Sequence, residues 1–211
     1  MMTEASQKAL EILRQGGHFE WPVITLFVLA VYVYAVEIER RNWNVVLGGL
    51  AFYGMDLFNE IWNGLVLHFT GRSAVWTTPG GTSYLIFVGL TIEISIMFAI
   101  LGVALLKMLP KDKSLRILGM PNRGFFVLLN SALCVFIEVL LNRADALIWE
   151  YSWWRFPNVL LLFLFGYVPF MVVSFWVHDL EKIKSKLVVL ALIYGADFTA
   201  ILIFACGLKW I

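Results

Sequence analysis

The stretch NVVLGGLAFYGMDLFNEIWNGLVLHF runs from Asn44 to Phe69 and is long and apolar enough to cross a lipid bilayer as a helix. It nevertheless carries Asp56, Asn59, Glu60 and Asn63 near its middle. Positions 56, 60 and 63 lie on one face of a helix, with Asn59 beside them. A charged carboxylate at the bilayer centre costs about 2.5–3.5 kcal/mol, and the stretch contains no Lys or Arg. We therefore expect this face to line a protein interior, with its acids protonated, solvated or bound to a cation.

The composition of the whole chain indicates a membrane protein. Of its 211 residues, 61% are hydrophobic and 15% are charged, and the mean hydropathy is +0.82. A soluble domain of this size does not carry so much apolar surface. The net charge of +1 gives no indication of a nucleic-acid partner. Because the chain has no zinc-ligand spacing, phosphate-binding glycine loop or nucleotide fingerprint, we predict neither a metal nor a cofactor.

The first 17 residues predict a short amphipathic helix that lies on the membrane surface. Apolar residues recur there at helical spacing, and charged residues occupy the opposite side: Ala5, Ala9, Ile12 and Leu13 against Glu4, Lys8, Glu11 and Arg14. Gly16 and Gly17 end the helix. We expect residues 18–211 to form a single transmembrane domain.

This domain is predicted to be all-α, a polytopic bundle of about six transmembrane helices. The expected spans are 21–36, 44–69, 82–108, 122–142, 157–177 and 187–208. Pro169 is expected to kink the fifth span. Glu93 falls near the midpoint of the third span.

The distribution of basic residues predicts the orientation of the bundle. Ten Lys and Arg residues lie in the loops after the first, third and fifth spans, and six lie on the opposite side. Because cytoplasmic loops carry an excess of Lys and Arg, we expect these odd-numbered loops to be cytoplasmic and both termini to lie outside. The predicted location is the cell or inner membrane, crossed several times. The sequence leaves the oligomeric state open.

Five carboxyl groups fall within four of the expected spans: Asp56, Glu60, Glu93, Glu138 and Asp197. None has a basic residue at its own depth. Burial without a partner disfavours the charged form of a carboxyl group. We therefore expect some of these groups to be neutral acids, and a buried neutral acid can donate a proton to a substrate.

Aromatic residues concentrate on the proposed outer side, at span ends and in loops. Glu138, Asn142, Asp145 and Trp149 follow helical spacing, which predicts that the fourth helix continues beyond the membrane. Aromatic faces stabilise cations. An acid that protonates an alkene or epoxide, beside aromatic walls that hold the resulting carbocation, can cyclise an isoprenoid supplied by the membrane.

Three segments carry a resemblance to known families. They are NEIWNG (59–64), GLTIEISIMFAI (89–100) and FIEVLLNRADALIWEYSWW (136–154). The first two resemble helices of small integral-membrane terpene cyclases from meroterpenoid and indole-terpenoid pathways. The third is similar to acid- and aromatic-rich segments of membrane carotenoid cyclases and hydratases. The resemblance implies metal-independent cyclisation by intramembrane acids, with Glu60 and Asp197 as the acids of the second and last helices.

The leading hypothesis is a membrane-embedded enzyme, an isomerase or lyase, that transfers protons to and from a lipophilic, isoprenoid-type substrate. Its expected catalytic residues are Glu60, Asp197 and Asp56. Its expected substrate-binding residues are Glu93, Glu138, Asn59, Asn63, Trp62, Asn142 and Trp149. One alternative is a cation- or proton-coupled transporter or channel, which the same acids would serve. The other is a non-catalytic scaffold or lipid-binding protein.

Overall fold

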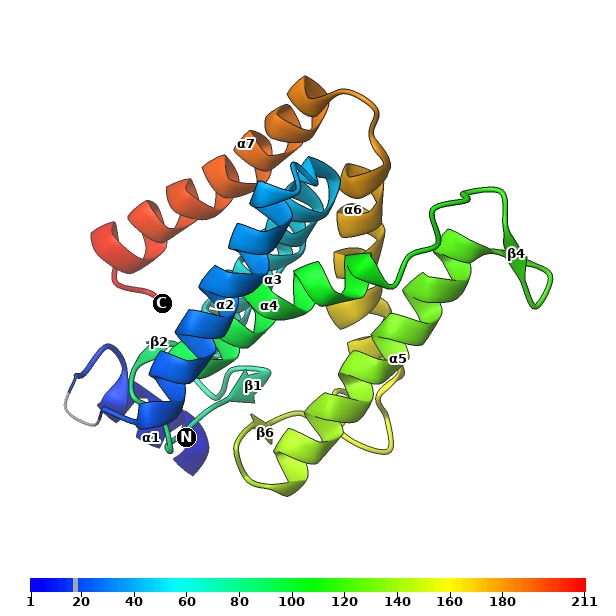
Figure 1. Cartoon of the computed structure of the whole chain (residues 1–211). Coiled ribbons are helices and arrows are strands. Elements are labelled where there is room, and N and C mark those ends of the chain that lie inside the picture. Colours follow the sequence, from blue (N-terminus) through cyan, green and yellow to red (C-terminus); the bar gives the residue numbers. More distant parts are fainter. Residues whose placement is uncertain (17–18) are drawn as a thin grey trace.

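Helix α3 (Trp43–Thr70) lies at the centre of the fold and packs against α4 (Ile92–Lys107), α6 (Val168–Asp179) and α7 (Ile183–Ala200) (Figure 1). The computed structural model describes residues 1–16 and 19–211. The remaining α-helices are α1 (Glu4–Ile12), α2 (Trp21–Glu39) and α5 (Asn122–Arg143). Two π-helical segments, η1 (Leu162–Tyr167) and η2 (Ile201–Gly207), precede α6 and follow α7.

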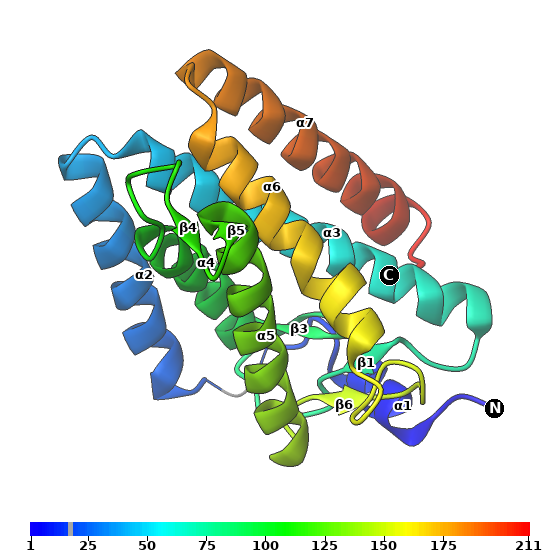
Figure 2. The ribbon, with the colours of Figure 1, turned by 90° about the vertical axis from the view of Figure 1, so that its right-hand side faces the viewer.

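Six short strands add a feature that the all-α prediction did not contain. They form three antiparallel pairs: β1 (Trp76–Thr77) with β6 (Ile148–Trp149), β2 (Leu85–Phe87) with β3 (Leu90–Thr91), and β4 (Arg116–Ile117) with β5 (Met120–Pro121). In both Figure 1 and Figure 2, α1, β1 and β6 gather at one end of the helices. The α2–α3 and α6–α7 connections lie at the other end.

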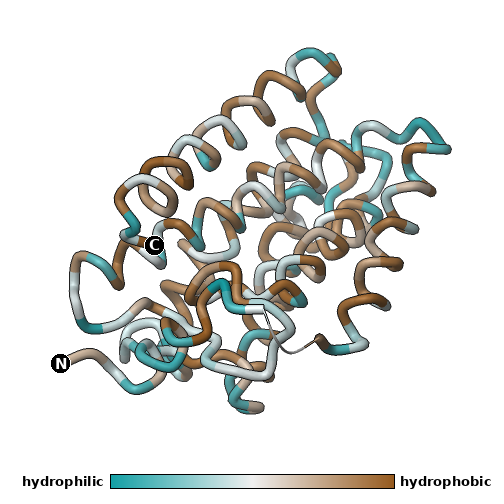
Figure 3. The backbone as a smooth tube through the Cα atoms, turned by 90° about the vertical axis from the view of Figure 1, so that its left-hand side faces the viewer, coloured by the Kyte–Doolittle hydropathy of each residue, from teal (hydrophilic) through white to brown (hydrophobic). Residues whose placement is uncertain are grey.

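The structure supports an integral membrane protein built of apolar helices. Four helical segments are long and apolar enough to cross a membrane: Trp21–Glu39, Asn122–Arg143, Leu162–Asp179 and Ile183–Gly207. The residues of the helices are mostly hydrophobic, and hydrophilic residues gather in the connections and near the N-terminus (Figure 3). Six crossings are not confirmed. Helix α3 is long enough to cross but has several polar residues on one face, and α4 has only 16 residues. The orientation of the loops stays a prediction.

The expected third span, 82–108, is wrong at its beginning. Residues 85–91 form the β2–β3 pair, and the helix begins only at Ile92, where the Thr91 side chain accepts a hydrogen bond from the Ile94 N–H. An N-cap of this kind satisfies a backbone donor that the first helical turn leaves unpaired. Glu93 therefore lies in the first turn of α4 and not at a mid-span position.

One other helix prediction also differs from the structure, and the helix that contains Pro169 is irregular. Helix α5 ends at Arg143 and does not continue to Trp149, which lies in β6. The segment before Pro169 forms the π-helical turns of η1. Because proline has no N–H to donate, the regular helical hydrogen-bond pattern is interrupted there, and π-helical turns are a common way to absorb the interruption.

Helices α3 and α4 approach each other closely through glycine. A methyl group added at Gly102 of α4 would lie 2.8 Å from the carbonyl oxygen of Gly49 and 3.1 Å from its Cα. Small residues at such a crossing let two backbones touch, which is a frequent mode of helix packing in membranes. This crossing holds α4 against the part of α3 that precedes its acids.

We expect Gly102→Ala to lower the free energy of unfolding by about 1–3 kcal/mol, because the added methyl group forces the two backbones apart. Thermal unfolding in detergent micelles measures the effect. The matched control is Gly195→Ala on the exposed side of α7, where an added methyl group meets open space. That change should raise stability by up to about 1 kcal/mol, because alanine favours the helix. Equal unfolding temperatures for the two variants would contradict the proposed role of Gly102.

Helix α1 packs on the protein itself. Ala9 is fully buried in a small apolar cluster with Leu67, Leu85 and Val88. Thr3 and Ser6 donate hydrogen bonds to Glu150, at 2.7 and 3.2 Å. Part of the apolar side that we expected to contact the membrane is thus covered by other segments of the chain. The expected boundary between positions 17 and 18 lies outside the described residues.

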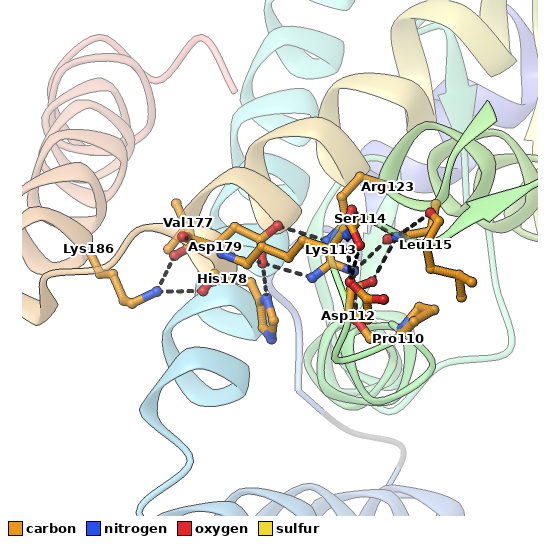
Figure 4. Close-up of polar contacts among 11 residues, drawn as sticks. Pro110, Asp112, Lys113, Ser114, Leu115, Arg123, Val177, His178, Asp179 and Lys186 are labelled. Atoms are coloured by element: carbon orange, nitrogen blue, oxygen red, sulfur yellow. Dashed lines mark hydrogen bonds and ion pairs between the residues drawn. The ribbon is translucent and has the colours of Figure 1, made fainter.

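Polar contacts tie the α4–α5 connection to the end of α6 (Figure 4). Arg123 donates two hydrogen bonds to Asp179, at 2.7 and 3.0 Å, and His178 contacts the same carboxylate at 2.8 Å. The buried ammonium group of Lys186 donates to the Val177 and His178 carbonyls. The Lys186 contacts satisfy carbonyls that the end of a helix leaves unpaired. Together these contacts fix the end of the molecule that is remote from β1 and β6.

Candidate functional site

Three buried carboxyl groups line one small cavity inside the protein. The cavity has a volume of about 50 Å³, and its acids are Asp56 and Glu60 of α3 and Glu138 of α5. Each of the three residues is at most 7% exposed. A space of this size admits a few water molecules. The rest of its wall includes five aromatic side chains, from Trp76, Phe98, Trp154, Tyr167 and Phe170.

Two glutamates of the cavity are held by tryptophans that face each other across the β1–β6 pair. Trp76 of β1 is the register partner of Trp149 of β6. The indole N–H of Trp76 donates to Glu60 at 2.9 Å, and that of Trp149 donates to Glu138 at 2.7 Å. An indole can only donate. The two-residue strands therefore position one carboxyl group from α3 and one from α5.

Asn63 secures β1 against α3. Its side-chain oxygen accepts hydrogen bonds from the backbone N–H groups of Val75 and Trp76, at 2.7 and 3.2 Å. Its amide group donates to the Trp76 carbonyl oxygen at 2.8 Å. Asn63 is fully buried. Asn63 and Glu60 lie on the same face of α3. The helix therefore holds β1 through Asn63 and presents Glu60 to the Trp76 side chain of that strand.

The carboxyl oxygens of the cavity differ in their hydrogen bonds. Each oxygen of Glu138 has one donor: Trp149 donates to one oxygen, and the Tyr167 hydroxyl donates to the other at 2.5 Å. Within the part of the chain that the structure describes, one oxygen of Asp56 and one of Glu60 are buried without a partner. A buried polar atom without a partner is costly. Such an oxygen is free to carry a proton or to contact a bound molecule.

The aromatic side chains next to these acids form two groups of rings in contact. Trp76 and Trp154 are stacked with their ring centres 5.7 Å apart. Phe170 contacts Phe98 and Tyr167 edge-to-face, at 6.2 and 5.9 Å. Ring faces of this kind attract a positive charge. The cavity thus combines groups that can move a proton with groups that can stabilise a cation.

The cavity contains four of the residues expected from the sequence. Asp56, Asn59, Glu60 and Glu138 all line it. Trp149 contacts Glu138 directly, although it reaches the acid through β6 and not through an extended helix.

The other expected site residues lie elsewhere. Asn142 donates to the Leu147 carbonyl and closes the turn after α5. Glu93 accepts hydrogen bonds from Thr82 and Ser83 and secures the loop before α4. Asn63 is occupied with β1, as described above.

Trp62 and Asp197 were also expected to contribute to the site. Trp62 is 38% exposed and lines an outer aromatic groove with Trp153 and Trp154, of which Trp154 also lines the acid cavity. Asp197 is buried on α7, which packs along α3, and one of its oxygens has no partner within residues 1–16 and 19–211. It is not among the residues that line the cavity. The structure therefore does not bring Asp197 together with Asp56 and Glu60.

Two residues that contact the acids, Trp76 and Tyr167, were not among the site residues expected from the sequence. The signal for Tyr167 is the clearer of the two. Tyr167 interrupts the apolar run LLLFLFGYVPF immediately after Gly166, and its hydroxyl contacts Glu138. A phenol within an apolar span needs a hydrogen-bond partner when it is buried, and this requirement is the signal that could have identified it.

Among the described residues, no group of three or more His, Cys, Asp or Glu side chains is arranged to hold a metal ion.

We expect Trp149→Phe to lower the free energy of unfolding by about 1–3 kcal/mol, because Glu138 loses a buried donor while its oxygen stays buried. The β1–β6 backbone pairing does not depend on the indole N–H. Trp153→Phe is the matched control, since Trp153 is 41% exposed. Unfolding in detergent, followed by circular dichroism, compares the two variants. Equal loss of stability in both would show that the Trp149 contact with Glu138 is not important for the fold.

Comparison with known proteins places the chain in a family. A family model described as an uncharacterized membrane protein family matches residues 3–206. An uncharacterized protein from Archaeoglobus fulgidus is 49% identical over 211 residues, the full length of both chains. Another uncharacterized protein from this organism is 33% identical over 55 residues, which is 26% of this chain and 98% of the relative. No solved structure matches the chain. The chain therefore belongs to this uncharacterized family of membrane proteins.

Proposed function

We propose that this protein is a membrane-embedded enzyme that adds a proton to a lipophilic, isoprenoid-type substrate and removes another. The observation that carries the proposal is the convergence of Asp56, Glu60 and Glu138 on one aromatic-walled cavity. Acids buried inside a membrane protein are costly, and they mark proton relays or substrate sites more often than they serve packing alone. The resemblance of residues 59–64 and 89–100 to membrane terpene cyclases supports the substrate class.

The proposed reaction begins with an acid from α3. The free oxygen of Glu60 or Asp56 carries a proton, and its O–H bond breaks as a C–H bond forms at one carbon of a substrate double bond. The adjacent carbon becomes a carbocation. A second double bond of the same substrate can attack it, which closes a ring and moves the positive charge. The walls formed by Trp76 and Phe98 face this charge and stabilise it.

The reaction ends with proton loss to a second carboxylate, a role that we assign to Glu138. A C–H bond next to the cation breaks, and its electron pair forms the new double bond. Substrate and product are isomers, so the reaction needs no oxidant or reductant. Trp149 and Tyr167 hold both oxygens of Glu138, which orients the base for this step.

Deuterium incorporation tests the proposal. Membranes that contain the protein are incubated in D₂O with neutral polyprenyl lipids, and the lipid extract is analysed by mass spectrometry. We expect an isomeric product that carries one solvent deuteron at carbon. Membranes that contain the Asp56→Asn, Glu60→Gln, Glu138→Gln triple variant are the control and should give none. Absence of a deuterated product, together with acid-dependent proton flux in liposomes, would favour a transporter instead.

A further inference from the structure

A larger apolar groove lies between α2, α4 and α5 and opens toward the outside of the helices. Its volume is about 320 Å³, at the lower end of the range for small-molecule sites. Leu29 of α2 and Met97 and Ala104 of α4 line its outer part, and all three are exposed. Ile137 of α5 lines it from the other side. Figure 1 shows α2 beside α4, with α5 farther from α2.

The groove adjoins the acid cavity. The two spaces share a set of lining residues, namely Ile94, Phe98, Glu138, Leu141 and Tyr167. Among the described residues that line the groove, Glu138 is the only one of the types Asp, Glu, Lys and Arg. The groove is therefore apolar at its outer part and reaches a hydrogen-bonded carboxyl group at its inner part.

The charges of this path restrict what can occupy it. No Lys, Arg or His is among the described residues that line the groove or the cavity. A phosphate or diphosphate group would have no cationic partner there and would meet Asp56, Glu60 and Glu138 instead. Burial of such an unpaired charge is strongly unfavourable. The inner end thus fits an uncharged group.

We propose that the groove binds the hydrocarbon chain of an uncharged, single-chain lipid, which enters sideways from the bilayer with its reactive end toward Glu138. The exposed outer part lies among helices whose surfaces suit the bilayer, so the chain does not cross water. The inner space of about 50 Å³ is too small for a bulky head group, so only the end of the chain can approach the acids. The inference rests on the proposed function for the reaction itself, whereas binding of the chain can be measured separately.

Photocrosslinking tests the binding. The probe is a neutral polyprenyl alcohol that carries a diazirine within its chain, and the full-length protein is held in lipid nanodiscs. Irradiation and peptide mass spectrometry locate the adducts. We expect them on groove-lining positions of α2, α4 and α5, and competition by the unlabelled alcohol should remove them. Adducts spread evenly over the exposed apolar positions of all helices would overturn the proposal.

A pair of alanine variants tests the groove itself. Ala104→Phe fills the groove from α4, and it should reduce labelling about tenfold, the change expected when overpacking opposes binding. Ala132→Phe is the matched control on α5, because Ala132 is exposed and does not line the groove. It should label as the unmodified protein does. Equal labelling of the two variants, with both folded by circular dichroism, would overturn the proposal.

Glu60→Gln separates this inference from the proposed reaction. The change alters the cavity and leaves the groove lining intact, so labelling should persist at the unmodified level. Groove labelling without any deuterated product in the unmodified protein would leave the chain site standing and reject the enzyme. Product formation that Ala104→Phe does not slow would leave the enzyme standing and reject the groove as its entrance.

Discussion

Glu60→Gln is expected to lower turnover of an isoprenoid substrate by about 10²–10⁴-fold, the range by which a positioned general acid or base accelerates a reaction. Glutamine has nearly the same shape, and its side-chain oxygen can still accept the hydrogen bond from Trp76. It has no acidic proton to give to a double bond. Initial rates and deuterium incorporation, measured in nanodiscs at several pH values, give the size of the loss.

Glu93→Gln is the matched control for this prediction. Glu93 was expected from the sequence to belong to the same site, but it binds Thr82 and Ser83 in the loop before α4. Its replacement should leave the rate within about threefold of the unmodified protein, as expected for a residue outside the chemistry. Equal losses in both variants would point to a general effect on structure, and full activity of Glu60→Gln would remove Glu60 from the mechanism. Asp56→Asn then shows whether the proton comes from the other unpartnered acid.

Asn63→Leu is expected to have the largest effect on stability. Leucine can neither accept from the backbone N–H groups of Val75 and Trp76 nor donate to the Trp76 carbonyl. Each buried polar group left unpaired costs about 1–3 kcal/mol, so we expect a total loss of about 3 kcal/mol or more. Denaturant unfolding in detergent micelles, followed by tryptophan fluorescence, measures it.

Asn59→Leu makes the same chemical change one helical turn earlier. Asn59 is partly exposed, and no side-chain hydrogen bond involves it within the described residues. Its replacement should change stability by about 1 kcal/mol or less. If the two leucine variants unfolded at the same denaturant concentration, the contacts of Asn63 with β1 would not be what holds this part of the fold.

The polar face of α3 could be predicted because helical spacing alone places Asp56 and Glu60 together. Glu138 was also recognisable as an acid within an apolar span. Glu93 was misplaced because the apolar residues 85–91 look like helix in sequence, while in the structure they form a β2–β3 pair with Thr91 as the cap. Nothing in the spacing of Asp197 shows which neighbour α7 packs against, since a helix that is apolar all round gives no preferred face.

The pairing of β1 with β6 lies beyond what the sequence can indicate. Each strand has two residues, and about seventy residues separate them, so neither alternation nor turn chemistry identifies the partner. Helical spacing predicts that Glu138 and Trp149 lie on one extended helix. They do meet, but only because the chain reverses direction after Arg143 and returns along β1. The local sequence pattern therefore identifies Glu138 and Trp149 as site residues, but only the long-range β1–β6 pairing explains how they meet.

The register of Trp76 opposite Trp149 also bears on how the family can diversify. The spacing between Glu60 and Glu138 depends on two loop segments, 71–76 and 144–149, and not on the two helices alone. Insertion or deletion of one residue in either segment would turn an indole to the opposite side of the ladder and uncouple one glutamate from its donor. We therefore expect the lengths of these two loops to vary less among relatives than the exposed apolar surfaces of the helices do.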